Sequence, residues 1–145
     1  MNETIEKFGY PATLVREYGH WLVLLRPQQP TLGSLVLAAK SDARAFSDLS
    51  AEGFAELATA TREIEATLRS AVDYAKINYL MLMMVDPYVH FHVIPRYEGS
   101  REILGVEVAD KGWPKIPALG EARGLTGEEI DVLRDWLKGA WSSAA

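Results

Sequence analysis

The chain has 145 residues, a length typical of one domain, and 48% of them are apolar, which is enough to build a core. It contains no cysteine, which excludes disulfides, a cysteine nucleophile and thiolate metal ligands, and which fits a reducing cytoplasm. The net charge of −5 argues against binding of long nucleic acid, which usually requires a basic face. It still allows a small phosphorylated ligand held by a few local donors.

The sequence also gives no sign of a membrane protein. The first eight residues lack the basic-then-apolar order of a signal peptide. The most apolar run, residues 77–85, is far too short to span a bilayer. We therefore expect a cytoplasmic protein that folds as a single domain over residues 1–145.

The first part of the chain predicts strands. Residues 13–26 read as two strands joined by a tight turn, because Tyr18-Gly19 interrupts a strand-forming run. Two prolines and a glycine make residues 26–33 a loop. The short apolar run over residues 34–39 then predicts another strand.

A long helix is predicted next. Ser50 is a residue type that caps helices, and Glu52 in the first turn suits the partial positive charge at a helix N-terminus. Apolar residues then recur at spacings of three and four as far as about residue 73. We expect this helix to pack on a sheet through one face, which carries Phe54, Leu57, Thr61, Ile64, Leu68 and Ala71.

Two more strands are predicted after this helix. Residues 77–85 are apolar on both sides, which is typical of a central strand, and Asp86-Pro87 then bends the chain. Residues 88–94 alternate strictly, and Pro95 is expected to end the strand. One face of this strand would carry Tyr88, His90, His92 and Ile94.

The C-terminal part combines an irregular segment with a last helix. Residues 99–125 are rich in glycine and proline, with an edge strand expected near residues 103–108. The tetrapeptide TGEE, residues 126–129, is a capping box that begins a helix with Ile130, Leu133 and Leu137 on its buried side. Together these elements predict an α+β fold, an antiparallel sheet with the long helix and the C-terminal helix packed on it.

His90 and His92 raise the question of function. They share one face of the strand, about 6.6 Å apart along it, whereas the Val-Phe-Val of the other face suits a core. Two adjacent imidazoles in apolar packing would each need hydrogen-bond partners, so we expect their face to line solvent or a cleft. A metal ion is an alternative, but zinc requires three or four ligands and only Asp86 is a further candidate. We therefore expect no metal and no cofactor.

Covalent catalysis by imidazole is a third alternative. A neutral histidine can attack phosphorus through one ring nitrogen if the other nitrogen keeps its proton on a fixed acceptor. Carbonyl groups of a rigid strand are such acceptors. The second histidine can then bind the phosphoryl oxygens or assist the leaving group.

The stretch YVHFHVIPR, residues 88–96, resembles the signature of the histidine triad (HIT) family, in which three histidines alternate with apolar residues and Pro-Arg often follows. The order of the surrounding elements is similar too, so the resemblance covers residues 10–98. It implies a sheet with helices packed on it, usually in a homodimer. It also implies nucleotidyl hydrolase or transferase activity on nucleoside phosphoramidates or dinucleoside polyphosphates. The family's nucleophile is the middle histidine, which matches His90, and His92 matches the third.

Three departures from the family pattern bear on the activity. Tyr88 stands where the first triad histidine belongs, and Gly33-Ser34 where many relatives have Gly-His. Residues 84–87 read MVDP where many relatives carry a loop with Gly-Gln. The nucleophile is thus kept while parts of the phosphate-binding shell are replaced. Two functions remain open: an active hydrolase, and a nucleotide-binding or regulatory protein with weak or no catalysis.

Further residues are candidates for substrate binding. Tyr88 shares the histidine face, and its hydroxyl could donate to a phosphate oxygen. Arg26 lies in the loop where relatives contact the nucleotide sugar, and it could meet a phosphate or be a solvated loop arginine. For Arg96, a phosphate contact and a salt bridge elsewhere are both open. Phe8 and Trp21 could flank a base, although aromatic residues in such positions more often belong to the core.

Overall fold

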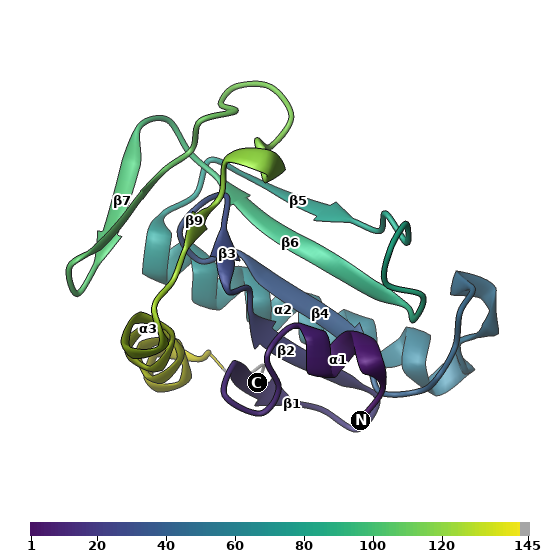
Figure 1. Cartoon of the computed structure of the whole chain (residues 1–145). Coiled ribbons are helices and arrows are strands. Elements are labelled where there is room, and N and C mark those ends of the chain that lie inside the picture. Colours follow the sequence, from purple (N-terminus) through teal and green to yellow (C-terminus); the bar gives the residue numbers. More distant parts are fainter. Residues whose placement is uncertain (143–145) are drawn as a thin grey trace.

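A five-stranded antiparallel sheet forms the centre of the protein, whose computed structural model describes residues 1–142 (Figure 1). The strand order is β1-β2-β4-β6-β5. These strands are β1 (Leu14–Glu17), β2 (Trp21–Leu25), β4 (Leu35–Ala39), β6 (His90–Arg96) and β5 (Lys76–Leu80). The predicted hairpin at Tyr18-Gly19 is therefore confirmed, as is the strand that follows the proline-rich loop.

The remaining elements surround this sheet. Two short ladders lie outside it and are formed by β3 (Gln28–Gln29) with β9 (Arg123–Gly124), and by β7 (Ser100–Ile103) with β8 (Val106–Ala109). The helices are α1 (Glu3–Lys7), α2 (Ala51–Val72) and α3 (Gly127–Ala140), with 3-10 turns η1 (Phe46–Asp48) and η2 (Leu119–Glu121). The predicted α+β fold is confirmed. Within residues 1–142, no helix combines the length and apolar character needed to cross a bilayer.

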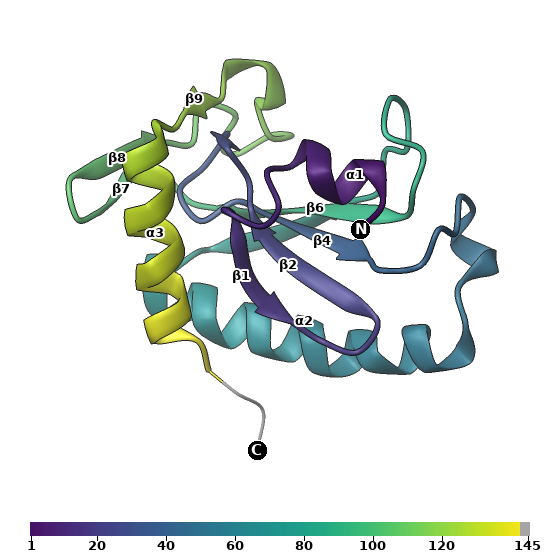
Figure 2. The same cartoon turned by 60° about the horizontal axis from the view of Figure 1, so that its bottom comes forward.

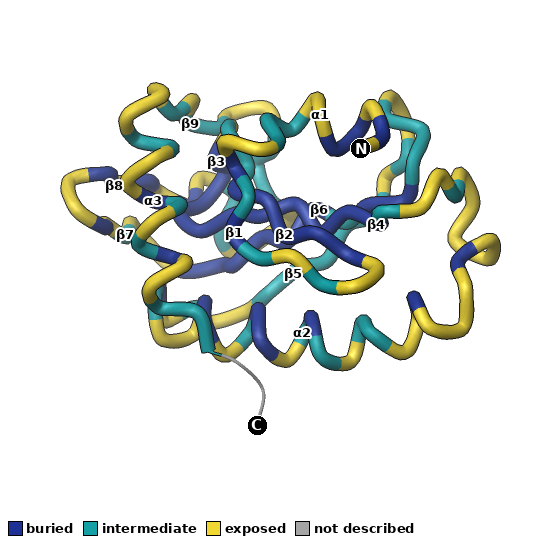
Figure 3. The backbone as a smooth tube through the Cα atoms, turned by 90° about the horizontal axis from the view of Figure 1, so that it is seen from below, coloured by how far each residue is buried: buried dark blue, intermediate teal, exposed yellow. Residues whose placement is uncertain are grey.

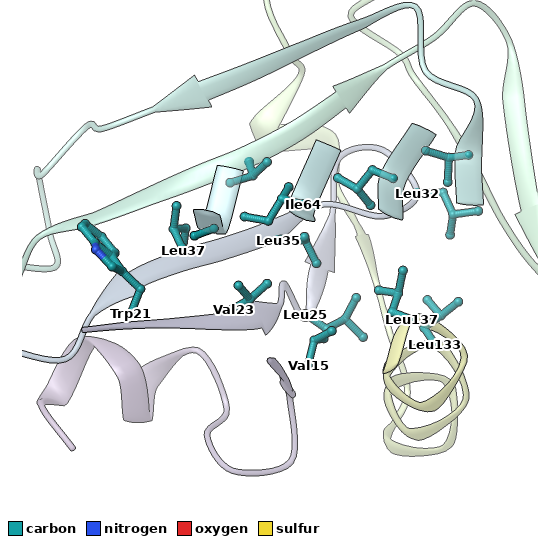
Figure 4. Close-up of a cluster of buried hydrophobic side chains, with 14 of the residues drawn as sticks. Val15, Trp21, Val23, Leu25, Leu32, Leu35, Leu37, Ile64, Leu133 and Leu137 are labelled. Carbon is teal, nitrogen blue, oxygen red and sulfur yellow. The ribbon is translucent and has the colours of Figure 1, made fainter. Parts of the chain in front are cut away.

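The two faces of the sheet have different covers. Helix α2 lies under one face and α1 lies on the opposite face (Figure 2). Figure 4 shows the main core on the α2 side, where the odd-numbered residues of the central strands meet α2 and α3. A smaller cluster lies on the α1 side and contains Ile5, Leu22, Leu24, Val36 and Ala38. The central strands are consequently buried, whereas the outer side of α2 is exposed (Figure 3).

The long helix begins and ends where the sequence predicts. The Ser50 hydroxyl accepts a hydrogen bond from the Gly53 N–H and so caps α2. The predicted packing face is right at Ile64 and Leu68 but wrong at Phe54, which is 40% exposed. Gly53 takes the inner position instead, where its carbonyl accepts a hydrogen bond from the Trp21 indole at 2.8 Å. Phe54 therefore turns outward and packs on Phe46, with ring centroids 5.2 Å apart.

The two strands after α2 differ from their prediction. The first is shorter than residues 77–85 and lies at the edge of the sheet, so its apolar character does not mark a central strand. The second begins at His90 and continues through Pro95. Proline is tolerated there because the pairs with β4 end at Val93, so the missing N–H faces no bond from that strand.

The C-terminal third is more regular than predicted. Residues 100–109 form the β7–β8 hairpin in a sheet of its own, rather than one edge strand near residues 103–108. The predicted capping box is confirmed, because the Thr126 hydroxyl and the Glu129 carboxylate each accept a hydrogen bond from the other residue's N–H. The last helix buries Leu133 and Leu137, as its periodicity predicts.

Candidate functional site

His90 and His92 lie on the face of the sheet that α1 covers. Their partners on β4 are Ala38 and Val36, both of which belong to the apolar cluster under α1. The two imidazoles are in edge-to-face contact with ring centroids 5.1 Å apart. The strand alternation thus brings the two histidines together, as predicted.

The ring of His90 is held in one orientation by the backbone. Its Nδ1 atom lies 2.7 Å from the carbonyl oxygen of Tyr88. A carbonyl only accepts hydrogen bonds, so Nδ1 carries a proton, and in the neutral ring the lone pair is on Nε2. This is the arrangement that an imidazole nucleophile requires.

The ring of His92 is held by a cation instead. The Nε of Arg26 donates to Nδ1 of His92 at 3.3 Å, which leaves the imidazole proton on Nε2. Burial, the Arg26 charge and His90 lower the pKa of His92 to about 4, and Asp86 offsets only part of this shift. His92 is therefore neutral at pH 7.

Arg26 itself is an unusual neighbour for a histidine. Burial lowers the pKa of its guanidinium, and a second hydrogen bond runs from Nη1 to the carbonyl of Gln28 at 2.6 Å. Within residues 1–142 no carboxylate forms an ion pair with it. The structure therefore brings Arg26 to the histidines, not into solvent, and leaves its charge uncompensated.

A small pocket opens beside the histidines. Its volume is about 130 Å³, and it is lined by Leu82, Met83, Met84, Val85, Asp86, His90 and His92. Phe8, at the end of α1, approaches both imidazoles with centroid distances of 5.7 and 5.6 Å. Phe8 thus lies at the site, in line with its candidacy, whereas Trp21 is a buried core residue.

Tyr88 lies on the α1 side of the sheet, as predicted, but outside the regular strand. It precedes β6 instead of lying in it, and its hydroxyl lies 3.5 Å from Nη2 of Arg44, whose guanidinium stacks on its ring. Its side chain lines another pocket with residues 1–3, Lys40 and Asp42. Its N–H donates to the Thr4 hydroxyl of α1 at 3.4 Å, and Val89 faces the main core, so the predicted alternation of faces extends to Tyr88. What Tyr88 gives to the histidine site in this structure is its backbone carbonyl.

Arg96 lies on the histidine face but at the far end of β6. It forms a two-point ion pair with Asp110, with Nε–Oδ2 at 2.8 Å and Nη2–Oδ1 at 3.2 Å. Its Nη1 donates to the side-chain oxygen of Asn78 at 2.9 Å. Of the two alternatives for Arg96, the salt bridge is therefore the one that the structure shows. Asn78, for which the sequence offers no role, is its second partner.

The segment that walls the pocket could not be identified from the sequence. Residues 81–85 read as the end of an apolar strand, but the chain leaves the sheet after Leu80. Met83 in this segment has φ +54°, a backbone conformation that apolar patterns do not signal. Within residues 1–142, no cluster of three or more His, Asp or Glu side chains is placed to hold a metal ion.

Comparisons with known proteins agree on the fold. No protein-family model matches the chain, and no curated protein matches its sequence significantly. Among solved structures, a histidine triad protein from Sinorhizobium meliloti is 23% identical with a TM-score of 0.74, over 97% of this chain and 95% of that one. A histidine triad protein from Bradyrhizobium japonicum is 18% identical with a TM-score of 0.73, over 98% and 97%.

A diadenosine triphosphate hydrolase from Plasmodium falciparum is also similar, at 10% identity with a TM-score of 0.64, over 89% of this chain and 76% of that one. The chain has the histidine triad fold, which confirms the resemblance of its sequence at the level of the fold. At these identities the activity must be inferred from this chain's own residues.

Proposed function

We propose that the protein is a nucleotidyl hydrolase or transferase that acts on a nucleoside phosphoramidate or a dinucleoside polyphosphate through a nucleotidyl intermediate on His90. The observation that carries this proposal is the 2.7 Å contact between Nδ1 of His90 and the Tyr88 carbonyl. That contact leaves the Nε2 lone pair free and oriented before any substrate binds. Preorganisation of this kind lowers the barrier to attack, because the ring loses little rotational entropy when the substrate reacts.

The chemistry follows from the orientation of the two rings. The Nε2 lone pair of His90 attacks the phosphorus atom, and the bond to the leaving group breaks as the P–N bond forms. Water then attacks the same phosphorus atom, the P–N electrons return to Nε2, and the proton that the water loses passes to solvent. The Nε2–H of His92 and the charge of Arg26 support this reaction by stabilising the phosphoryl oxygens.

Mapping of the covalent adduct tests the proposal. We expect mass spectrometry after incubation with substrate to show an acid-labile nucleotidyl group on His90, and His90→Ala to abolish both adduct and turnover. His92→Ala should slow turnover without moving the attachment site. The matched control is His20→Ala, because His20 is the one other histidine and is exposed in a separate hairpin. An adduct on His92, or full activity in His90→Ala, would overturn the proposal.

A second candidate function is nucleotide binding without catalysis. Phe8 favours it, because its ring packs on both imidazoles, which are only 2% and 8% exposed. In that case a nucleoside monophosphate should bind in calorimetry while substrates are not turned over. Phe8→Ala would then strengthen binding without producing activity. Turnover above the His90→Ala background would exclude this second candidate.

A further inference from the structure

We propose that Arg26 makes this site selective for substrates whose leaving group departs as a phosphate anion, because it holds His92 as a neutral hydrogen-bond donor and itself provides the positive charge. This inference rests on the proposed function and narrows its substrate class. Arg26 would be a specificity-determining residue, since its charge meets the departing oxygen. A substrate whose leaving group is an amine would react slowly.

The geometry around His92 gives the first reason. The guanidinium of Arg26 donates to Nδ1, so that nitrogen cannot also hold a proton. The other groups that face His92 are His90 on the same strand and Asp86 on the pocket wall. Asp86 already pairs with Lys7 at 2.8 Å, which weakens its pull on a proton at His92. These contacts keep His92 neutral with its only N–H on Nε2.

The chemistry of the leaving group gives the second reason. When His90 displaces a phosphate, the P–O electron pair leaves on an oxygen that is stable as an anion and needs no proton. When it displaces an amine, the P–N electron pair requires a proton, which an acid must donate during bond breaking. A neutral imidazole is a weak acid, whereas a fixed cation stabilises a departing anion directly. The arrangement therefore favours P–O over P–N cleavage.

The sheet surface beyond His92 gives an independent reason. Leu80 is the β5 partner of His92, so the two side chains share a face, and Asn78 and Lys76 follow on that face. A pocket of about 280 Å³ lies over these residues and beneath the segment from Trp113 to Pro117. Lys76 and Lys115 both line it. The ammonium groups of these two lysines would attract a leaving group along this face only if that group were anionic.

Two matched substrates test the inference. Each carries adenosine monophosphate, linked through P–O–P to a second phosphate in one and through P–N to an amine in the other. We expect kcat/KM of the parent protein to be at least about tenfold higher for the P–O–P substrate. Arg26→Gln should lower that value about tenfold or more and lower kcat/KM for the P–N substrate clearly less, so that the ratio of the two values falls. Arg26→Lys should keep most of the selectivity.

Arg69→Gln is the control variant, because Arg69 is an exposed arginine on α2 whose guanidinium contacts Tyr74. It should behave as the parent protein does. Equal losses of kcat/KM on both substrates in Arg26→Gln, or a parent protein that prefers the P–N substrate, would overturn the inference. Neither result would contradict the proposed role of His90 as the nucleophile. Absence of both turnover and adduct in the parent protein would overturn the proposed function and this inference together.

A nitrogen-15 NMR measurement tests the geometry without turnover. Imidazole correlation spectra of the parent protein should show His92 as the Nε2–H tautomer, with a pKa of about 4. In Arg26→Gln that pKa should rise toward the ordinary value of about 6.5. A Nδ1–H tautomer in the parent protein, or a pKa that does not change in the variant, would overturn the inference.

Discussion

The carbonyl oxygen of Tyr88 and Nδ1 of His90 lie 2.7 Å apart, so a residue two positions before the first imidazole orients it through the backbone. The side chain of the same residue points to another partner, Arg44, whose Nη2 lies 3.5 Å from the hydroxyl. The two ends of Tyr88 therefore have separate roles. A backbone contact is available to any residue type, so it does not by itself require tyrosine.

Tyr88→Phe separates these roles. It removes the hydroxyl and keeps the carbonyl, so we expect kcat/KM to stay within about twofold of the parent value. A loss of about tenfold would instead show that the hydroxyl reaches a phosphate oxygen, as the sequence predicts. Tyr74→Phe is the matched control, because the Tyr74 hydroxyl also accepts a hydrogen bond from an arginine, at 3.0 Å.

The buried ion pair of Arg96 and Asp110 should dominate local stability. The side chains are 4% and 1% exposed, and Asp110 also accepts hydrogen bonds from the backbone N–H groups of Tyr97 and Gly112. Asp110→Ala leaves a buried cation without its partner, so we expect the free energy of unfolding to fall by about 3–5 kcal/mol in urea denaturation.

An exposed aspartate provides the control for Asp110. Asp131 pairs with Arg134 at 3.0 Å, but its side chain is 60% exposed. Asp131→Ala should therefore cost less than about 1 kcal/mol. Similar losses in the two variants would contradict the structural role assigned to the Arg96–Asp110 pair.

Local signals explain which parts of the fold the sequence could predict. The caps at Ser50 and Thr126 and the alternation of His90 with His92 depend on residues within a few positions of one another. They were right because the chemistry is complete within a short segment. Phe54 was misplaced because periodicity cannot distinguish the true packing face from one a residue away, and Gly53 accepts the indole of Trp21 from β2.

The site was less accessible to sequence reasoning because its contacts join distant segments. Arg26 and His92 are 66 positions apart and meet only because β2 and β6 flank β4. Phe8 is also far from the histidines in the sequence, and it contacts both imidazoles from the end of α1. Neither contact has a local pattern, although the family resemblance did mark the region of Arg26 as one that faces a ligand.

Homodimerisation remains a prediction, and the structure suggests where to test it. Strand β5 lies at an edge of the sheet, and edge strands offer unpaired backbone groups to a second copy. The adjacent Leu82, Met84 and Val85 are 50%, 85% and 80% exposed. We propose that this edge is the dimer contact, so light scattering should give a dimer at micromolar concentration and Met84→Asp should weaken it.

The control for this test is Leu104→Asp. Leu104 is 69% exposed, but it lies at the turn of the β7–β8 hairpin, away from β5. The variant should keep the mass of the parent protein. A monomer throughout the micromolar range, or equal weakening by both variants, would contradict a dimer at the β5 edge.

His92 should make the stability of the protein depend on pH. Its pKa is about 4 in the folded protein, below the value of about 6.5 for an unfolded chain. Between these values the unfolded state binds more protons, so stability is fully present above pH 6.5 and is lost as the pH falls toward 4. From pH 7 to pH 4.5 this group should remove about 2 kcal/mol from the free energy of unfolding.

The variant His92→Gln isolates this contribution from that of the carboxylates. Urea denaturation at pH 7 and pH 4.5 should show a drop in unfolding free energy that is about 2 kcal/mol smaller in the variant than in the parent protein. His20→Gln should follow the parent protein, because His20 is exposed. If His92→Gln lost as much stability on acidification as the parent protein, His92 would not be held neutral by Arg26 and burial.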